Sequence, residues 1–185
     1  MSTVHNQLNR PVHLARRDAF YERGVELLFQ PLQHMATATR IQHLQQVMDL
    51  LSTAKQHAFF AYRGQKPAQK EVDFHEFLKL ILDNVQSIHS MMLHQSHLEE
   101  AESFLCQFLN TSSEQCQLPA MHYRRRAEDL MQGLWQMMQL AYAPYRTLQA
   151  SFRESASPEE LARYQKAFSS FEEETRTRFP NPTAA

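Results

Sequence analysis

Glycine is scarce in this sequence. Only Gly24, Gly64 and Gly133 occur among 185 residues. Loops that wrap a phosphate with backbone N–H groups need several closely spaced glycines, because a side chain would block the close approach. The sequence also contains no GxGxxG, GxxxxGK or GxSxG motif. Nucleotide-binding α/β folds and α/β-hydrolases are therefore poor candidates.

Cysteines and long apolar runs are sparse as well. Cys106 and Cys116 are the only cysteines, too few for a disulfide framework or a zinc knuckle. No stretch approaches the roughly 18 uninterrupted apolar residues of a membrane-spanning helix. The N-terminal segment lacks the apolar centre of a signal peptide. We therefore expect a cytoplasmic protein with buried or incidental thiols.

Neither sign of charge dominates. Nineteen Lys and Arg residues stand against twenty Asp and Glu, so the formal net charge is −1. No global field then steers the chain to nucleic acid or to an anionic membrane, and nucleic acid is not an expected partner. The run Arg124–Arg125–Arg126 could contact an acidic partner, although three arginines on a helix are more typical of a solvated face.

Helical apolar spacing is what the sequence has in abundance, and two-residue alternation is almost absent. Short polar connections favour antiparallel neighbours, so we expect an all-α, up-and-down bundle of four to five helices. A single domain is expected over residues 1–179, followed by a disordered tail, 180–185. The predicted helices run from after Pro11 to before Pro31, from about Thr37 to Tyr62, from about Val72 to Leu109, from about Ala120 with a kink or an end near Ala143, and from Pro158 to near Arg178.

Three of the predicted helices carry a capping signal at their N-terminus. Asn9 is expected to cap the first helix and Asp73 the third, while SPEE, residues 157–160, is a capping box with proline at the first helical position. Along the second helix, His43 and His57 fall off the apolar stripe. Both are expected on the surface.

The third predicted helix changes its apolar face along its length. Beyond Leu98 the apolar residues centre on nearly the opposite side from those before it, as ideal helix geometry places them. The sequence therefore predicts that this long helix kinks, or changes packing partner, near residues 92–98. The residues that share the earlier face are Phe74, Phe77, Leu78, Ile81, Val85, Ile88 and Met92.

A histidine cluster lies at this same change of face. His94 and His97 are three residues apart and Glu100 follows three later, so their side chains could share a divalent metal such as zinc, iron or manganese. Such a site needs a second ligand helix, since three ligands at this spacing spread over about 120°. The alternative is an exposed polar stretch where the helix changes face. Glu71 and His75 form a second pair, which a helix start explains without chemistry.

The segment LMQGLWQMMQLAYAPY, residues 130–145, is rich in methionine and aromatic residues. Methionine adapts to varied partners, so this face could bind another protein, but a wide apolar face also fits a core helix. The leading hypothesis is a non-catalytic interaction or regulatory protein that binds a protein partner through a helical groove or this face, with no cofactor. Self-association through heptad-like stripes stays open. The predicted partner-binding residues are Met131, Trp135, Met138, Tyr142 and Tyr145.

Two other function classes remain as alternatives. One is a metal- or cofactor-dependent helical-bundle enzyme that uses His94, His97 and Glu100. The other comes from a resemblance: the amphipathic helices and the stretch SPEELARYQ, residues 157–165, resemble phasins, the helical proteins that coat polyester storage granules. That resemblance implies a granule- or membrane-surface protein acting through the fourth predicted helix.

Overall fold

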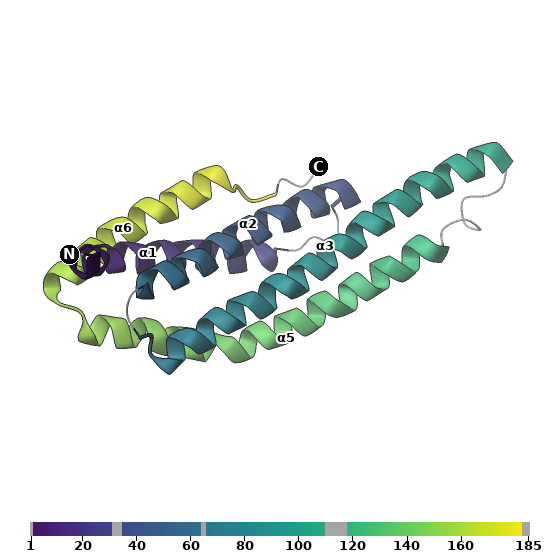
Figure 1. The fold of residues 1–185 in the computed structure, drawn as a ribbon. Helices are drawn as coiled ribbons and strands as arrows, with labels where there is room; N and C mark the ends of the chain where they lie inside the picture. The colour runs from purple at the N-terminus through teal and green to yellow at the C-terminus, as the bar shows by residue number, and fades with distance from the viewer. Residues whose placement is uncertain (1, 31–34, 64–65, 110–117, 183–185) are drawn as a thin grey trace.

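The computed structural model describes residues 2–30, 35–63, 66–109 and 118–182. These residues fold into helices α1 (Ser2–Leu28), α2 (Thr37–Tyr62), α3 (Gln69–Leu109), α5 (Leu118–Ser155) and α6 (Pro158–Arg178), with no strand among them. The closely packed pairs are α1 with α2, α2 with α3, α3 with α5, and α6 with α1, as Figure 1 shows. The predicted all-α bundle is confirmed.

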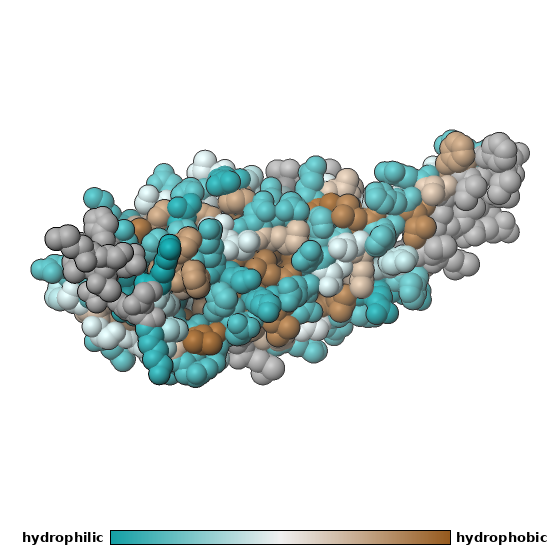
Figure 2. Space-filling view, in the orientation of Figure 1, coloured by the Kyte–Doolittle hydropathy of each residue, from teal (hydrophilic) through white to brown (hydrophobic). Residues whose placement is uncertain are grey.

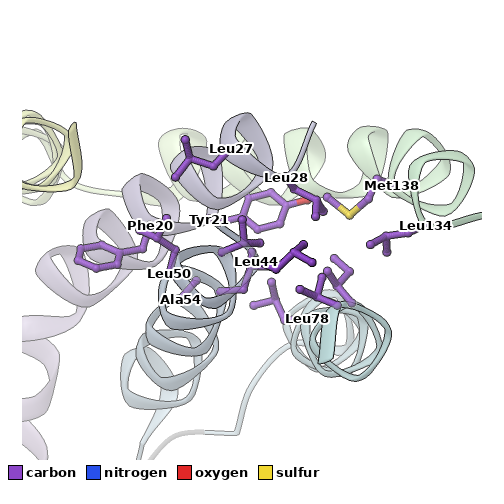
Figure 3. Packing of buried hydrophobic residues seen from close by; sticks show 14 of the residues in the cluster. Phe20, Tyr21, Leu27, Leu28, Leu44, Leu50, Ala54, Leu78, Leu134 and Met138 are labelled. Atoms are coloured by element: carbon purple, nitrogen blue, oxygen red, sulfur yellow. The ribbon is translucent and has the colours of Figure 1, made fainter. Parts of the chain in front are cut away.

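The core lies where α1, α2, α3 and α5 meet. Leu44 and Leu50 of α2 are buried against α1 and α3, and Figure 3 shows Leu28, Leu78 and Met138 converging on them from the other helices. Burying one leucine side chain contributes about 1.5–3 kcal/mol. The three-four spacing of apolar residues in the sequence therefore forms this main core, and a second, smaller cluster is made by Leu14, Ala15, Ala61, Phe152 and Tyr164.

The start of α1 differs from the prediction. The helix begins at Ser2, so Asn9 is not its cap, and Pro11 lies inside it. An internal proline removes one helix hydrogen bond and costs about 3 kcal/mol. Because α1 packs closely on both α2 and α6, tertiary packing outweighs that local cost. The predicted end before Pro31 is confirmed, since α1 ends at Leu28.

The start of α3 was also predicted too late. The helix begins at Gln69, and Asp73 is therefore not a cap. Its carboxylate instead accepts a hydrogen bond from the Gln69 side chain four residues earlier, at 2.7 Å. Such i,i+4 pairs stabilise a helix from within. The capping box of α6 is confirmed: Glu160 N donates to Ser157 Oγ at 3.2 Å, and Ser157 N donates to Glu160 Oε2 at 2.9 Å.

The long helix α3 changes its neighbour without a break. It is continuous to Leu109, and its buried face runs on from Met92 to Gln95, so the structure agrees with the second of the two predicted alternatives, a change of packing partner near residues 92–98. The neighbour α2 begins at Thr37, whose hydroxyl donates to Glu99 at 3.3 Å. Beyond this level α3 extends past α2 alongside α5 (Figure 1). The altered apolar pattern therefore marks where α2 starts.

A proline also lies inside α5. The helix passes through Pro144 to Ser155, and its ribbon changes direction in its second half (Figure 1). This agrees with the kink expected near Ala143, because a proline ring crowds the preceding turn.

His43 is buried, which contradicts its predicted surface position. Its exposed fraction is 2%, and its Nε2 lies 2.6 Å from the Leu27 carbonyl oxygen. The apolar spacing in the sequence predicts one buried stripe on this helix. Because α2 lies between α1 and α3, two of its faces are buried instead. His57 is half-buried.

The chain after α6 is held against α1. The buried Arg23 side chain donates from Nη2 to the Phe179 carbonyl oxygen at 2.6 Å and to Asn181 Oδ1 at 3.0 Å. The first residues of the predicted tail thus have a defined contact. Residues 183–185 lie outside the described part of the chain.

Candidate functional site

The three predicted metal ligands lie on the outer surface of α3. His94, His97 and Glu100 are all exposed, and the His94 ring faces the Tyr123 ring of α5 at 5.8 Å between centroids. Helix α5 thus brings an aromatic residue to His94. Among the described residues, no three His, Cys, Asp or Glu side chains are grouped so that they could hold a metal ion.

The predicted partner-binding residues of α5 divide between core and surface. Met138 and Tyr145 are buried, Met131 is half-buried, and Trp135 is 48% exposed. The side chain of Tyr142 lies outside the described part, as do those of both cysteines. Of the described side chains in this set, Trp135 is the most exposed to a partner.

Met138 and Tyr145 line a groove, which we call the α1–α5 groove. It has a volume of about 450 Å³ and lies between two helices that are not among the closely packed pairs. Its rim carries Glu22, Glu26 and Arg146. Trp135 lies about one turn before Met138 on α5. The apolar walls of the groove come from Tyr21 and Val25 of α1, from Phe29 directly after it, and from Met138 and Tyr145 of α5.

Tyr145 fixes the floor of this groove. Its hydroxyl donates to Glu22 at 3.1 Å and accepts from Gln149 Nε2 at 2.8 Å. Its ring lies 4.5 Å from that of Tyr21 and stacks on Phe74 at 5.4 Å. Burial, followed by the charges of Asp18 and Glu22, raises the pKa of Tyr145. The floor is therefore a neutral aromatic surface held by hydrogen bonds.

No protein family, curated protein or solved structure matches this chain. The chemistry of its own side chains is therefore what supports a function. No helix in the described ranges is long and apolar enough to cross a membrane.

A buried charge cluster joins α1, α3 and α6. Arg17 is 1% exposed, and its guanidinium donates from Nε to Asp18 at 2.7 Å and from Nη1 to Glu71 at 3.1 Å. The Tyr164 hydroxyl donates to the other Asp18 oxygen at 2.7 Å. Burial alone would lower the pKa of Arg17, but Asp18 and Glu71 together raise it. Arg17 thus stays charged inside the bundle.

The sequence analysis did not predict this charge cluster, although one feature of the sequence indicates it. Arg17 and Asp18 stand side by side between Ala15 and Phe20 on α1, where Arg16 is the one other charged residue. Adjacent opposite charges on a buried helix face indicate an internal ion pair. Glu71, which the sequence reading assigned to a helix start, supplies the second carboxylate.

Glu71 also lines a second cavity, which we call the α2–α3 cavity. Its volume is about 310 Å³. Burial raises the pKa of Glu71, and Arg17 opposes that rise. A pocket with apolar walls, a few polar groups and a perturbed carboxylate has the character of a small-molecule site. Its other lining residues are Ala58, Phe59, Tyr62, Arg63, Pro67, Val72 and His75.

Two histidines meet between α1 and α2. The Nδ1 atoms of His13 and His57 lie 2.9 Å apart, and both rings contact Phe60. Burial, with added repulsion from Arg16 and His13, lowers the pKa of His57 to about 4. Burial and Arg16 also lower the pKa of His13. The pair is therefore neutral at pH 7 and shares one proton in a ring-to-ring hydrogen bond.

This pair is expected to make the protein less stable in acid. The unfolded chain binds a proton at position 57 near pH 6.5 and the folded chain only near pH 4, so stability is lost as pH falls through that window. Since His57 is only half-buried, solvent screening reduces its share to roughly 1–2 kcal/mol. Urea unfolding between pH 7.5 and about 4.5 should therefore show a shallower pH dependence for His57→Leu than for wild type. The exposed His97→Leu is the control, and parallel wild-type and His57→Leu curves would refute the assignment.

Proposed function

We propose that this chain is a non-catalytic, cytoplasmic interaction protein that binds an amphipathic helix of a protein partner in the α1–α5 groove. The observation that carries the proposal is an apolar groove of about 450 Å³, together with the exposed Trp135, which lies three residues before the groove residue Met138 on α5. Among the described residues, the other large apolar side chains that are more than a third exposed do not line this groove. They are Phe59, Val72, Leu80, Phe104 and Met121. Figure 2 shows apolar patches separated by hydrophilic surface on the face in view.

The spacing of the groove residues fits a helical ligand. Tyr21 and Val25 are four residues apart on α1, and Phe29 follows four later in the turn that continues it, where its N–H donates to the Val25 carbonyl oxygen, so the three form one ridge. In helix-in-groove recognition the bound helix places apolar anchors three or four residues apart, which is the spacing of this ridge. Exposed Glu22 and Glu26 stand at the α1 rim. Basic residues beside the apolar face of the partner helix would therefore complement them.

Trp135 supplies both the anchor and the means of detection. It is the only tryptophan in the chain, so intrinsic fluorescence reports on this one site. Tryptophan is enriched among the residues that dominate binding energy, and truncating such an anchor typically costs about 2 kcal/mol or more. Partner binding is expected to shift its emission to shorter wavelengths, because the indole leaves water.

Site-specific photo-crosslinking in the native cell identifies the partner. A photoreactive residue at position 135 or at Gln139 in the groove should capture the same protein, whereas one at exposed Gln86 on α3 should not. With the purified partner, Trp135→Ala should raise the Kd by about 30-fold, and the exposed Leu80→Ala by less than about two-fold. Capture of a second copy of this chain would show that the chain is its own partner. Equal capture at all three positions, or an unchanged Kd for Trp135→Ala, would overturn the proposal.

A further inference from the structure

A third cavity lies between the start of α3 and the second half of α5, and we call it the α3–α5 cavity. Its volume is about 490 Å³, which is well within the range of small-molecule sites. It shares no lining residue with the α1–α5 groove or with the α2–α3 cavity. A ligand in this cavity would therefore not compete for the surface that we propose for a protein partner.

The walls of the α3–α5 cavity are apolar and largely aromatic. Phe74 and Phe77 of α3 form one wall, and Ala143 and Pro144 of α5 form the other. The Phe74 ring is held in place, because it is buried and stacks on the Tyr145 ring at 5.4 Å between centroids. Phe77 lies next to it, with 6.5 Å between the two ring centroids. Such walls suit a ligand with a flat apolar body.

One cation and one anion complete the lining. Lys70 and Asp73 are exposed and lie three residues apart in α3, so they share one side of the helix. Neither forms an ion pair with a residue that the structure describes, and Asp73 Oδ1 accepts one hydrogen bond, from Gln69 at 2.7 Å. An ammonium has three donors and a carboxylate about four acceptor positions. Both groups therefore have hydrogen-bonding capacity left for a ligand.

We propose that the α3–α5 cavity binds a free α-amino acid with an aromatic side chain. The carboxylate of the ligand accepts from Lys70, and its ammonium donates to Asp73. Its ring lies against Phe74, Phe77 and Pro144. A ligand with a single charge would be attracted by one of the two lining charges and repelled by the other, whereas a zwitterion complements both.

Three probes with the same ring and different charges test the proposal. They are L-phenylalanine, 2-phenylethylamine, which lacks the carboxylate, and 3-phenylpropionate, which lacks the ammonium. Titrations of the full chain at pH 7 and low salt are followed by backbone NMR shifts, which should centre on residues 70–77 and 143–147. Phenylalanine is expected to bind with a millimolar Kd, about three-fold tighter than either analogue, since each exposed ion pair contributes modestly. High salt should reduce this preference, because it screens both pairs.

Variants at exposed positions separate the two charges and the cavity. Lys70→Gln should remove the preference for phenylalanine over the amine and keep that over the propionate, whereas Asp73→Asn should do the reverse. Thr147→Trp fills the cavity and should abolish binding, while Ala150→Trp, an exposed position of α5 outside the lining, should leave it unchanged. Absence of saturable phenylalanine binding, an analogue that binds as tightly as phenylalanine, or full binding by Thr147→Trp would each overturn the proposal.

Discussion

Replacing Arg17 with methionine is expected to destabilise the protein by about 3–5 kcal/mol. Methionine fills a similar volume, but it removes the cation that faces Asp18 and Glu71 inside the bundle. Breaking a buried pair leaves uncompensated charge in a low-dielectric interior, which costs more than the pair itself contributes. Arg17 also covers the Phe74 ring at 5.4 Å, so packing between α1 and α3 weakens too. Urea unfolding followed by circular dichroism measures this loss.

The controls separate burial from charge. Arg125→Met removes the same group from an exposed position on α5 and should change stability by less than about 0.5 kcal/mol. Arg17→Lys keeps the charge but lacks the planar fork that reaches both carboxylates, so it should lie between wild type and Arg17→Met. An Arg17→Met protein within about 1 kcal/mol of wild type would show that Asp18 and Glu71 do not depend on Arg17.

Local signals in the sequence predicted the helices well. The bounds of α2 agree at both ends, and the Ser157 capping box starts α6 as expected. Both follow from interactions within a few residues. The starts of α1 and α3 were missed because Pro11 and Asp73 are local signals that packing between helices overrode.

Contacts between distant residues explain what the sequence could not show. Arg17 and Glu71 are 54 positions apart, so nothing local links them. The changed apolar face of α3 was visible in the sequence, yet its cause is the start of α2 at Thr37, beside Glu99. A pattern on one helix records that its surroundings change and does not identify the neighbour that changes.

The candidate site was predicted only in outline. The apolar spacing of α5 singled out Met138 and Tyr145, but a groove wall and a core both require apolar residues at that spacing. Only the position of α1 turns this face into a groove and leaves Trp135 exposed. Glu71 illustrates the same limit, since its cavity needs Tyr62 of α2 beside it.

Gly24→Val is expected to destabilise the protein by about 3 kcal/mol, because α2 side chains lie directly against this glycine of α1. A Cβ atom at position 24 would lie 2.8 Å from Leu51 Cδ2 and 3.1 Å from Leu51 Cγ. Leu51 has no exposed surface, and the Leu50 Cβ, at 3.5 Å from the same point, closes the other side. Valine adds two further methyl groups there, so the helices must separate or Leu51 must leave its rotamer. Thermal and urea unfolding measure the cost.

The other described glycine tests whether this cost comes from contact or from the helix itself. Gly133 lies in α5, and a Cβ there would meet nothing within 4 Å, so Gly133→Val should be neutral or stabilise by a few tenths of a kcal/mol, roughly the difference in helix propensity. Combining Gly24→Val with Leu51→Ala should cost less than the sum of the single changes, because alanine at position 51 removes the atoms that valine meets. If the losses in free energy of unfolding for Gly24→Val and Leu51→Ala simply add in the double variant, the strain does not arise from the contact between Gly24 and Leu51. If Gly24→Val and Gly133→Val lose equal stability, the cost comes from placing valine in a helix and not from a tertiary contact.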